Sequence, residues 1–153
     1  MSIGTSDPRM AHLMIDVLAA RGVDRGYVVF GEEGLDELST EGPSRIYRLI
    51  DGEITEAEFT PEDFGIDRSP VSSLVGGDVA TNVDLTMRIL AGERGARRDA
   101  VVINAAPAIV LAGLAEGLMS ATALAADAID SGAAADALAR SVRMSRALSG
   151  SSP

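Results

Sequence analysis

The chain has 153 residues, of which 46% are apolar, so it is long enough and apolar enough to form one folded domain. Its net charge of −10 argues against nucleic acid and anionic membranes as partners, because both require a basic protein surface. It contains neither cysteine nor lysine, which excludes disulfides, thiolate chemistry and Schiff-base lysine chemistry within these residues. No apolar run is long enough to span a membrane, and the first residues do not resemble a signal peptide, so we expect a cytoplasmic protein.

Residues 9–21 predict a helix. Asp7 is placed to cap this helix, and Pro8 suits its first turn. Its apolar side chains fall at helical spacing on one face: Met10, Leu13, Met14, Val17 and Leu18. We expect that face to pack on the core. The single histidine, His12, lies off the face and is interpreted as a solvated side chain, since no second ligand stands at helical spacing from it.

The next segments predict strands. Residues 26–30 are nearly continuously apolar, which is typical of a buried strand, and the preceding helix favours a parallel one. Residues 44–59 predict a hairpin around Asp51-Gly52, a favoured two-residue turn. The sequence TPED at residues 60–63 then has a cap, a first-position proline and an acid three residues on, so we expect one short helical turn.

The second half of the chain predicts helices over residues 78–91, 99–113, 117–131 and 133–148. Within the second of these, the Val-Val-Ile start also suits a strand, but the length and the alanines favour a helix bent near Pro107. Three of these helices are expected to have an apolar face. The faces consist of Val79, Val83, Met87 and Leu90 in residues 78–91, and of Leu118, Ala121, Ala125 and Ile129 in residues 117–131. In residues 133–148, Leu138 and Val142 are expected to point inward. Arg140, Arg143 and Arg146 are expected on the solvated side of the last helix.

The sequence LVGGDVATN, residues 74–82, is a possible phosphate-binding motif. Two glycines before a helix can present backbone N–H groups to a phosphate. However, Asp78 stands at the same helix start, where its carboxylate satisfies those donors and would repel a phosphate. We therefore interpret this motif as a structural helix cap.

The strongest candidate for chemistry is GEEGLDELS, residues 31–39, which holds four carboxylates: Glu32, Glu33, Asp36 and Glu37. It follows a predicted parallel strand, and open α/β sheets bind ligands at the carboxyl ends of such strands. The spacing does not match an EF-hand loop. Mg²⁺ usually takes one or two carboxylates together with substrate phosphates. A bridge from Asp36 and Glu37 through Mg²⁺ to a pyrophosphate is one interpretation, and a solvated acidic loop is the other.

Five segments resemble one known family. VVFGEEGLDELSTEGPSRIYRL, FTPEDFGI, LVGGDVATN, AGERGARRDAVVINAA and AIDSGAA occur in the order found in the C-terminal half of anthranilate phosphoribosyltransferases, from about Ser6 to Leu148. The resemblance implies transfer of the phosphoribosyl group of phosphoribosyl pyrophosphate to anthranilate, in tryptophan biosynthesis. It also implies that GLDE is the family's acidic metal motif, with Asp36 and Glu37 coordinating Mg²⁺, which leaves the two earlier acids of the loop as solvated neighbours. No catalytic residue is assigned, and the substrate-binding residues are unknown.

The same resemblance implies the fold. We expect one incomplete α/β domain over residues 1–153, with a partial, mixed and mostly parallel sheet packed by helices. This is the C-terminal part of the nucleoside phosphorylase/phosphoribosyltransferase-like fold. Missing strands would then leave Tyr27–Phe30 with an unpaired edge or an apolar face. A pyrimidine nucleoside phosphorylase-like enzyme shares this fold, but no nucleoside motif is present.

Several parts of the family pattern do not occur among the 153 residues. These are the N-terminal helical domain, through which family dimers form, the GTGGD-type phosphate loop, the Lys-His-Gly-Asn segment and the anthranilate-binding residues. FGEEG also replaces the commoner His-Gly-Glu/Asp-Asp-Gly form. We therefore expect a fragment or subunit that supplies the acidic motif and has no transferase activity alone. The alternative is a non-catalytic remnant or an interaction subunit of a split enzyme.

Overall fold

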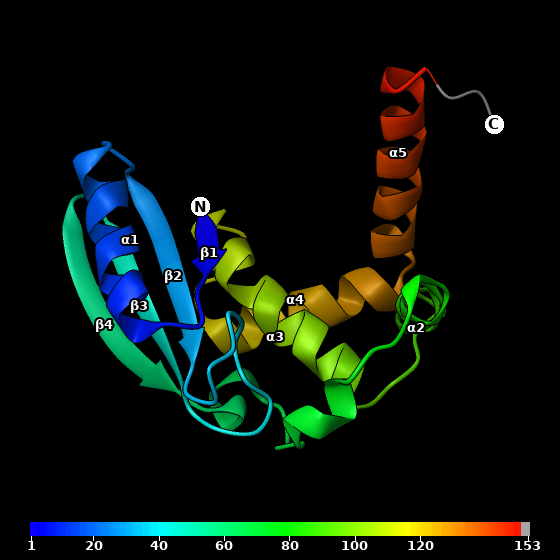
Figure 1. Cartoon of the computed structure of the whole chain (residues 1–153), viewed down its shortest axis with the longest axis horizontal. Coiled ribbons are helices and arrows are strands. Elements are labelled where there is room, and N and C mark those ends of the chain that lie inside the picture. The colour runs from blue at the N-terminus through cyan, green and yellow to red at the C-terminus, as the bar shows by residue number, and fades with distance from the viewer. Residues whose placement is uncertain (151–153) are drawn as a thin grey trace.

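The computed structural model describes residues 1–150, which form four strands, five α-helices and two short 3₁₀ helices (Figure 1). The strands are β1 (Ser2–Gly4), β2 (Arg25–Gly31), β3 (Ser44–Ile50) and β4 (Glu53–Phe59). The helices are α1 (Pro8–Ala20), η1 (Pro61–Phe64), η2 (Val71–Leu74), α2 (Val79–Leu90), α3 (Ala96–Leu111), α4 (Leu118–Asp130) and α5 (Ala133–Leu148). No helix among the described residues is long and apolar enough to cross a membrane.

The sheet has the order β1-β2-β3-β4. β1 and β2 are parallel, whereas β2–β3 and β3–β4 are antiparallel. The expected α/β class and mixed sheet are confirmed, but the expectation of a mostly parallel sheet is wrong for the described residues. The Asp51-Gly52 turn makes β3 and β4 antiparallel, and the loop of residues 32–43 brings the chain back from the end of β2 so that β3 is antiparallel to β2.

That turn has the geometry that the sequence predicts. Asp51 and Gly52 have φ values of 49° and 86°, which is the left-handed pair required by a two-residue type I′ turn. Glycine adopts this conformation without steric cost, and aspartate is among the residues that tolerate it. The predicted hairpin over residues 44–59 is therefore confirmed.

Strand β2 lies inside the sheet, not at its edge. It pairs with β1 on one side and β3 on the other. Val28 packs with α1 on one face, while Tyr27 and Val29 pack on the opposite face with side chains of α3 and α4. The expectation of an unpaired edge or uncovered apolar face at Tyr27–Phe30 is wrong, because the unpredicted three-residue strand β1 occupies the edge position.

Helix α1 covers one face of the sheet with a stripe that overlaps the predicted one only at Leu18 and the half-buried Met14. Ala11, Ile15 and Leu18 are buried against the sheet. The prediction that Met10, Leu13 and Val17 face the core is wrong, because all three are more than 40% exposed. The helix is apolar on more than one side, so its periodicity allowed two stripes and packing selected one.

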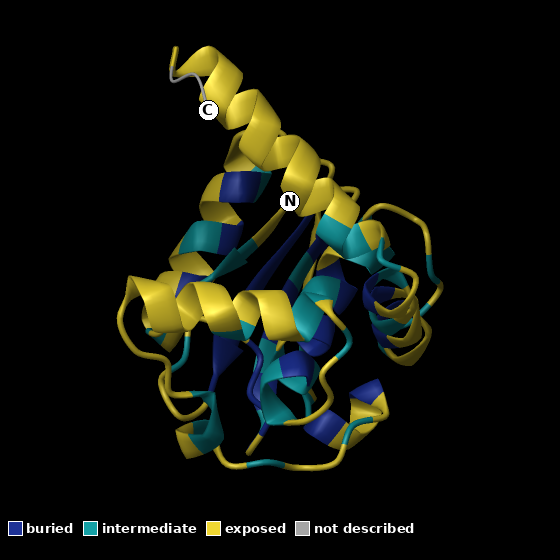
Figure 2. Ribbon diagram, turned by 90° about the vertical axis from the view of Figure 1, so that its right-hand side faces the viewer, coloured by how far each residue is buried: buried dark blue, intermediate teal, exposed yellow. Residues whose placement is uncertain are grey.

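Helix α5 projects from the body, and α2 lies near its base (Figure 1). Neither helix has a buried residue (Figure 2). Val79, Val83 and Met87 of α2 are exposed, and Leu138 and Val142 of α5 are each 39% exposed, so the inward orientation predicted for the α5 pair is wrong. By contrast, Ala121, Ala125 and Ile129 of α4 are buried as expected. The exposed arginines of α5 also match the prediction.

Helices α3 and α4 form the second helical layer and are joined by an ion pair. Arg98 of α3, whose side chain is 6% exposed, donates to both carboxylate oxygens of Asp130 at 2.6 and 2.8 Å. Hydrogen bonding to Arg98 lowers the pKa of the Asp130 carboxyl below its usual value. Pro107 lies inside α3 and is buried. The ambiguous run at residues 100–113 is therefore helical through residue 111.

Candidate functional site

The acidic loop, residues 31–39, begins at the carboxyl end of β2. Because β1 runs parallel to β2, the carboxyl ends of both strands point to the same side of the sheet. The start of the loop is closed by two backbone hydrogen bonds, in which Gly31 and Leu35 each donate to the other's carbonyl at 3.0 and 3.2 Å. Asp36 and Glu37 follow this closure directly.

The four carboxylates of the acidic loop differ in their partners. Asp36 and Glu37 are exposed, and their side chains have no hydrogen bond or ion pair with residues 1–150. Glu32, in contrast, accepts from Arg45 Nε at 2.7 Å. Glu32 is exposed, as expected of a solvated neighbour, and this pair holds its side chain against β3. The family resemblance selected Asp36 and Glu37, and the carboxylates of both are free to bind a ligand.

Two glycines allow the backbone of Asp36 and Glu37 to lie against the strand ends. A Cβ at Gly4, the last residue of β1, would overlap the carbonyl oxygen of Asp36. A Cβ at Gly31 would lie 2.8 Å from the carbonyl oxygen of Glu37, which is closer than real Cβ contacts allow. Both positions therefore require glycine for close backbone approach.

The residues after Glu37 are anchored by side-chain hydrogen bonds to the backbone. Asn104 of α3 accepts from Leu38 N at 2.7 Å and donates to Leu38 O at 3.1 Å. Ser44 Oγ accepts from Ser39 N at 2.8 Å. The hydroxyl of Ser39 in turn accepts from the backbone N–H groups of residues 41 and 42. These buried or half-buried contacts fix the loop where it leaves the acidic pair.

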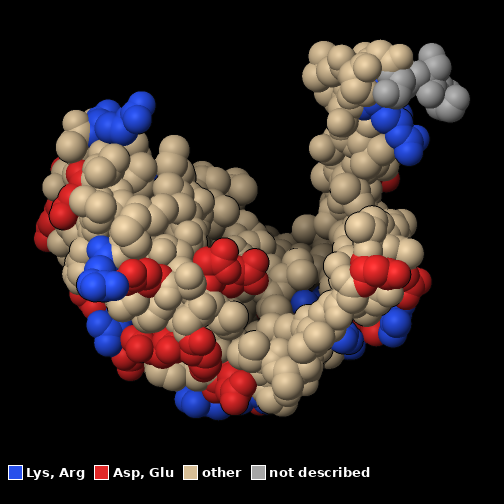
Figure 3. All heavy atoms as spheres, viewed as in Figure 1, with Lys and Arg blue, Asp and Glu red and all other residues tan. Residues whose placement is uncertain are grey.

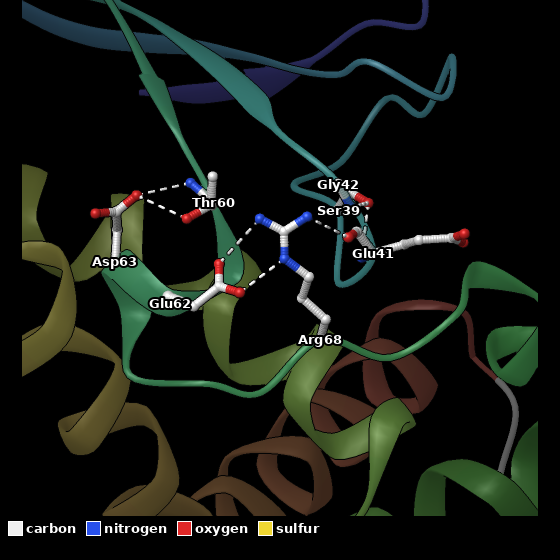
Figure 4. A network of polar contacts seen from close by, with 7 residues as sticks. All are labelled: Ser39, Glu41, Gly42, Thr60, Glu62, Asp63 and Arg68. Carbon is white, nitrogen blue, oxygen red and sulfur yellow. Dashed lines mark hydrogen bonds and ion pairs between the residues drawn. The ribbon is translucent and has the colours of Figure 1, made fainter.

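Arg68 ties η1 to the segment that follows the acidic loop (Figure 4). Its Nε donates to Glu62 Oε1 at 2.7 Å, and a second guanidinium nitrogen donates to the Glu41 carbonyl at 3.3 Å. The hydrogen bond from Arg68 lowers the pKa of the Glu62 carboxyl from 4.5 to about 2. The TPED turn is thus a support for the acidic loop, and Asp63 accepts from Thr60 N at 2.7 Å, as a capping acid does.

The glycine motif at residues 74–82 is a cap, as the sequence predicts. Asp78 Oδ1 accepts from Thr81 N at 2.8 Å at the start of α2. Asn82 adds a second contact, because its Oδ1 accepts from Gly77 N at 2.9 Å. Two backbone donors at this helix start, Thr81 N and Gly77 N, therefore already have acceptors.

A cavity of about 760 Å³ lies on the other side of the sheet from α1. Its lining includes Tyr27, Arg48 and Phe59, with the Arg48 guanidinium 5.3 Å from the centre of the Phe59 ring. No residue of the acidic loop lines it. The cavity and the free carboxylates are therefore separate features.

The coordination chemistry of the acidic loop suits a partly hydrated, hard cation. Residues 1–150 contain no group of three or more histidine or carboxylate side chains that could enclose a metal ion. Two carboxylates alone match Mg²⁺, which keeps several waters and takes the remaining ligands from phosphates. Acidic side chains also gather elsewhere on the surface (Figure 3), so negative charge alone does not define this site.

Sequence reasoning missed Gly4 and Asn104 as parts of this site. Gly4 belongs to a strand of three residues, too short for a periodic signal. Asn104 did carry a signal, because one amide side chain within the apolar run VVINAAPA must find hydrogen-bond partners. Its partner at Leu38 is 66 residues away and could not be identified from spacing.

The fold and the loop together define an α/β domain with free carboxylates at the carboxyl end of a parallel strand pair. The family model described as "Glycosyl transferase family, a/b domain" matches residues 2–135. The chain belongs to this glycosyl transferase family.

Curated relatives place the chain near one group of enzymes. It is 47% identical over 151 residues to the anthranilate phosphoribosyltransferase of Streptomyces avermitilis, covering 95% of this chain and 42% of that protein. It is 45% identical over 133 residues to the Moorella thermoacetica enzyme, covering 87% of this chain and 39% of that protein. The family resemblance is confirmed, and the chain spans about two fifths of the length of these relatives.

Solved structures agree. Anthranilate phosphoribosyltransferase from Thermus thermophilus superposes with a TM-score of 0.80 at 36% identity, covering 90% of this chain and 40% of that chain. The Saccharomyces cerevisiae enzyme in complex with PRPP and Mg has a TM-score of 0.75 at 20% identity, covering 86% of this chain and 38% of that chain. The second likeness concerns the fold alone.

Proposed function

We propose that this chain supplies the metal-binding carboxylates of an anthranilate phosphoribosyltransferase, a cytoplasmic enzyme of tryptophan biosynthesis. The observation that carries the proposal is the state of Asp36 and Glu37. Both are exposed, neither has a side-chain partner within residues 1–150, and the loop is fixed on both sides of them. The 47% identity to the Streptomyces avermitilis enzyme supports this choice of reaction.

In the proposed site, Asp36 and Glu37 would hold Mg²⁺ that is also bound to the pyrophosphate of phosphoribosyl pyrophosphate. When bound, Mg²⁺ neutralises the negative charge that develops on a departing pyrophosphate. The carboxylates contribute charge and oxygen ligands. The closure at Gly31–Leu35 and the anchor at Leu38 contribute orientation, because they limit how far the pair can move.

The remaining groups would come from the part of the family pattern that residues 1–153 do not contain. That part would bind anthranilate, add further contacts to the phosphates, and carry the surface through which family homodimers form. We expect no transfer by residues 1–153 alone, since they provide one portion of the site. Formation of phosphoribosyl-anthranilate by this chain alone would contradict that expectation.

Calorimetric titration with Mg²⁺, with and without phosphoribosyl pyrophosphate, tests the metal assignment. Binding in the presence of phosphoribosyl pyrophosphate should weaken strongly in Asp36→Asn and Glu37→Gln. Glu33→Gln is the matched control, because it removes an acid of the same loop and should leave binding unchanged. Equal binding by wild type and Asp36→Asn would exclude the assignment.

An interaction subunit without its own catalytic role is the second candidate. It is favoured by apolar side chains that face solvent on α1 and α2, including Met10, Leu13, Val79 and Val83. Such faces are typical of surfaces that another protein covers. The two candidates differ in one respect: the interaction role does not require Asp36 and Glu37, so their joint replacement would leave activity of a reconstituted enzyme intact.

A further inference from the structure

The amide of Asn104 is the longest-range polar contact made to the acidic loop. Its side chain extends from the middle of α3 and uses every hydrogen-bonding group of the amide. The oxygen accepts from Leu38 N at 2.7 Å, and the nitrogen donates to Leu38 O at 3.1 Å. The nitrogen also donates to Ala100 O at 3.0 Å, which orients the amide on its own helix.

Leu38 is held in a second way. Its side chain is 2% exposed and packs in the same core cluster as Ile103 and Ala106 of α3. The same cluster contains residues of the sheet and of α4, so α3 shares in holding the side chain of Leu38, whereas it alone bonds the Leu38 backbone through Asn104. Leu38 immediately follows Glu37, so the anchor acts one residue from the free carboxylates.

The other end of the pair is closed by the hydrogen bonds between Gly31 and Leu35. Asp36 and Glu37 are therefore the only two residues between two fixed points. Neither has a side-chain contact that would set its orientation. Their placement consequently depends on the backbone at Leu35 and Leu38.

We propose that Asn104 is a positioning residue for metal binding, acting through the backbone of Leu38 to hold Asp36 and Glu37 in a ligand-ready arrangement. This inference rests on the proposed function of the acidic pair. Groups that orient metal ligands from outside the coordination sphere typically contribute about 10–100-fold to metal affinity. Because Asn104 acts through the backbone, we expect the lower end, about tenfold.

The test measures Mn²⁺ affinity in the presence of phosphoribosyl pyrophosphate, using the electron paramagnetic resonance signal of free Mn²⁺. The quantity compared between variants is the Mn²⁺ affinity of the site whose binding Asp36→Asn removes. Asn104→Ala should weaken the Mn²⁺ affinity of that site about tenfold. The backbone amide of Leu38 should exchange its hydrogen faster in the same variant, because it loses its acceptor.

Asn82→Ala is the matched control. Asn82 makes the same kind of paired contact, accepting from Gly77 N at 2.9 Å and donating to Gly77 O at 3.0 Å, but on a loop without the acidic pair. It should leave Mn²⁺ affinity unchanged. Ile103→Val controls for lost stability next to Asn104, and its Mn²⁺ affinity should also be unchanged.

Asn104→Ser keeps the inference testable if Asn104→Ala does not fold. A serine hydroxyl can bond to the Ala100 carbonyl of its own helix, but it is too short to contact both backbone groups of Leu38. It should therefore lose Mn²⁺ affinity about as much as the alanine variant. Wild-type affinity in a folded Asn104 variant whose Leu38 amide exchanges faster would overturn the positioning role alone. Absence of Asp36-dependent binding in wild type would instead overturn the proposed function, and the inference with it.

Discussion

At the scale of single residues, the acidic pair depends on small or polar side chains around it more than on its own contacts. Gly4 and Gly31 allow the carbonyls of Asp36 and Glu37 to lie against two strand ends. Arg45 engages Glu32 and so separates it from the pair. The result is that one of the four neighbouring acids is engaged by an arginine, whereas Glu33, Asp36 and Glu37 have no side-chain partner among residues 1–150, although all four look alike in the sequence.

Replacing Gly4 with alanine tests this close approach. The added methyl group would overlap the Asp36 carbonyl, so the loop or the strand must move. We expect a loss of about 1–3 kcal/mol in the free energy of unfolding, measured by urea denaturation. Gly117→Ala is the control, since nothing lies within 4 Å of a Cβ there; because Gly117 is the N-cap of α4, its unfolding free energy should fall by up to about 1 kcal/mol, less than for Gly4→Ala. Equal stability of Gly4→Ala and wild type would show that the strand end does not constrain Asp36.

Glu62 gives a prediction for the pH dependence of stability. Its folded-state pKa of about 2 lies below its ordinary value of 4.5, because Arg68 hydrogen-bonds the ionised form. The stabilisation is therefore complete above about pH 4.5 and is lost as the pH falls toward 2. Both side chains are about half exposed, so solvent screening keeps the effect small.

The corresponding variant is Glu62→Gln. Thermal unfolding followed by circular dichroism should show wild type more stable than the variant at pH 6, with the difference disappearing as the pH falls from 4.5 to 2. Glu58→Gln, at an exposed β4 position without an ion pair in the described residues, should behave like wild type throughout. A Glu62 difference that persists at pH 2 would mean that the ion pair is not its source.

At the scale of elements, a structure that a segment's own residues determine could be predicted. The element against which a segment pairs or packs could not. The hairpin could be predicted because its turn residues, Asp51 and Gly52, determine their own geometry. Strand β1 could not, because its order comes from pairing with β2 and not from its own composition. On α1, periodicity revealed that the helix is amphipathic, but Ile15 and Val17 are both apolar and only packing distinguishes them. Asn104 was missed for the same reason, since its partner lies on a distant element.

The contrast between α3 and α5 leads to a second stability prediction. Ile103 of α3 is fully buried, so Ile103→Ala should lower the free energy of unfolding by about 2–5 kcal/mol. Leu138 of α5 is 39% exposed, and α5 has no buried residue, so Leu138→Ala should change it by less than about 0.5 kcal/mol. Urea denaturation measures both values. A cost at Leu138 close to that at Ile103 would mean that α5 packs against the body in solution.

At the scale of the whole molecule, the chain has a packed three-layer body and an extended helical end. The body contains the sheet between α1 and the α3–α4 layer, and it carries the acidic loop (Figure 1). A hollow separates this body from α5 (Figure 3). The chain spans about two fifths of its relatives' length, and apolar side chains of α1 and α2 face solvent. The family could be predicted from five ordered motifs. Which apolar side chains of α1 and α2 face solvent could not be predicted, because periodicity does not show which side of a helix is covered.

The most direct test of metal binding by Asp36 and Glu37 locates the bound metal on the folded chain. Mn²⁺, added with phosphoribosyl pyrophosphate to the ¹⁵N-labelled protein, broadens the amide signals of the residues nearest to it. We expect broadening to begin at residues 35–38 and at the end of β1, and Asp36→Asn to abolish it. Broadening centred instead on β4, which carries Glu53, Glu56 and Glu58, or spread evenly over all acidic surfaces, would contradict the assignment of Asp36 and Glu37 as the metal-binding pair.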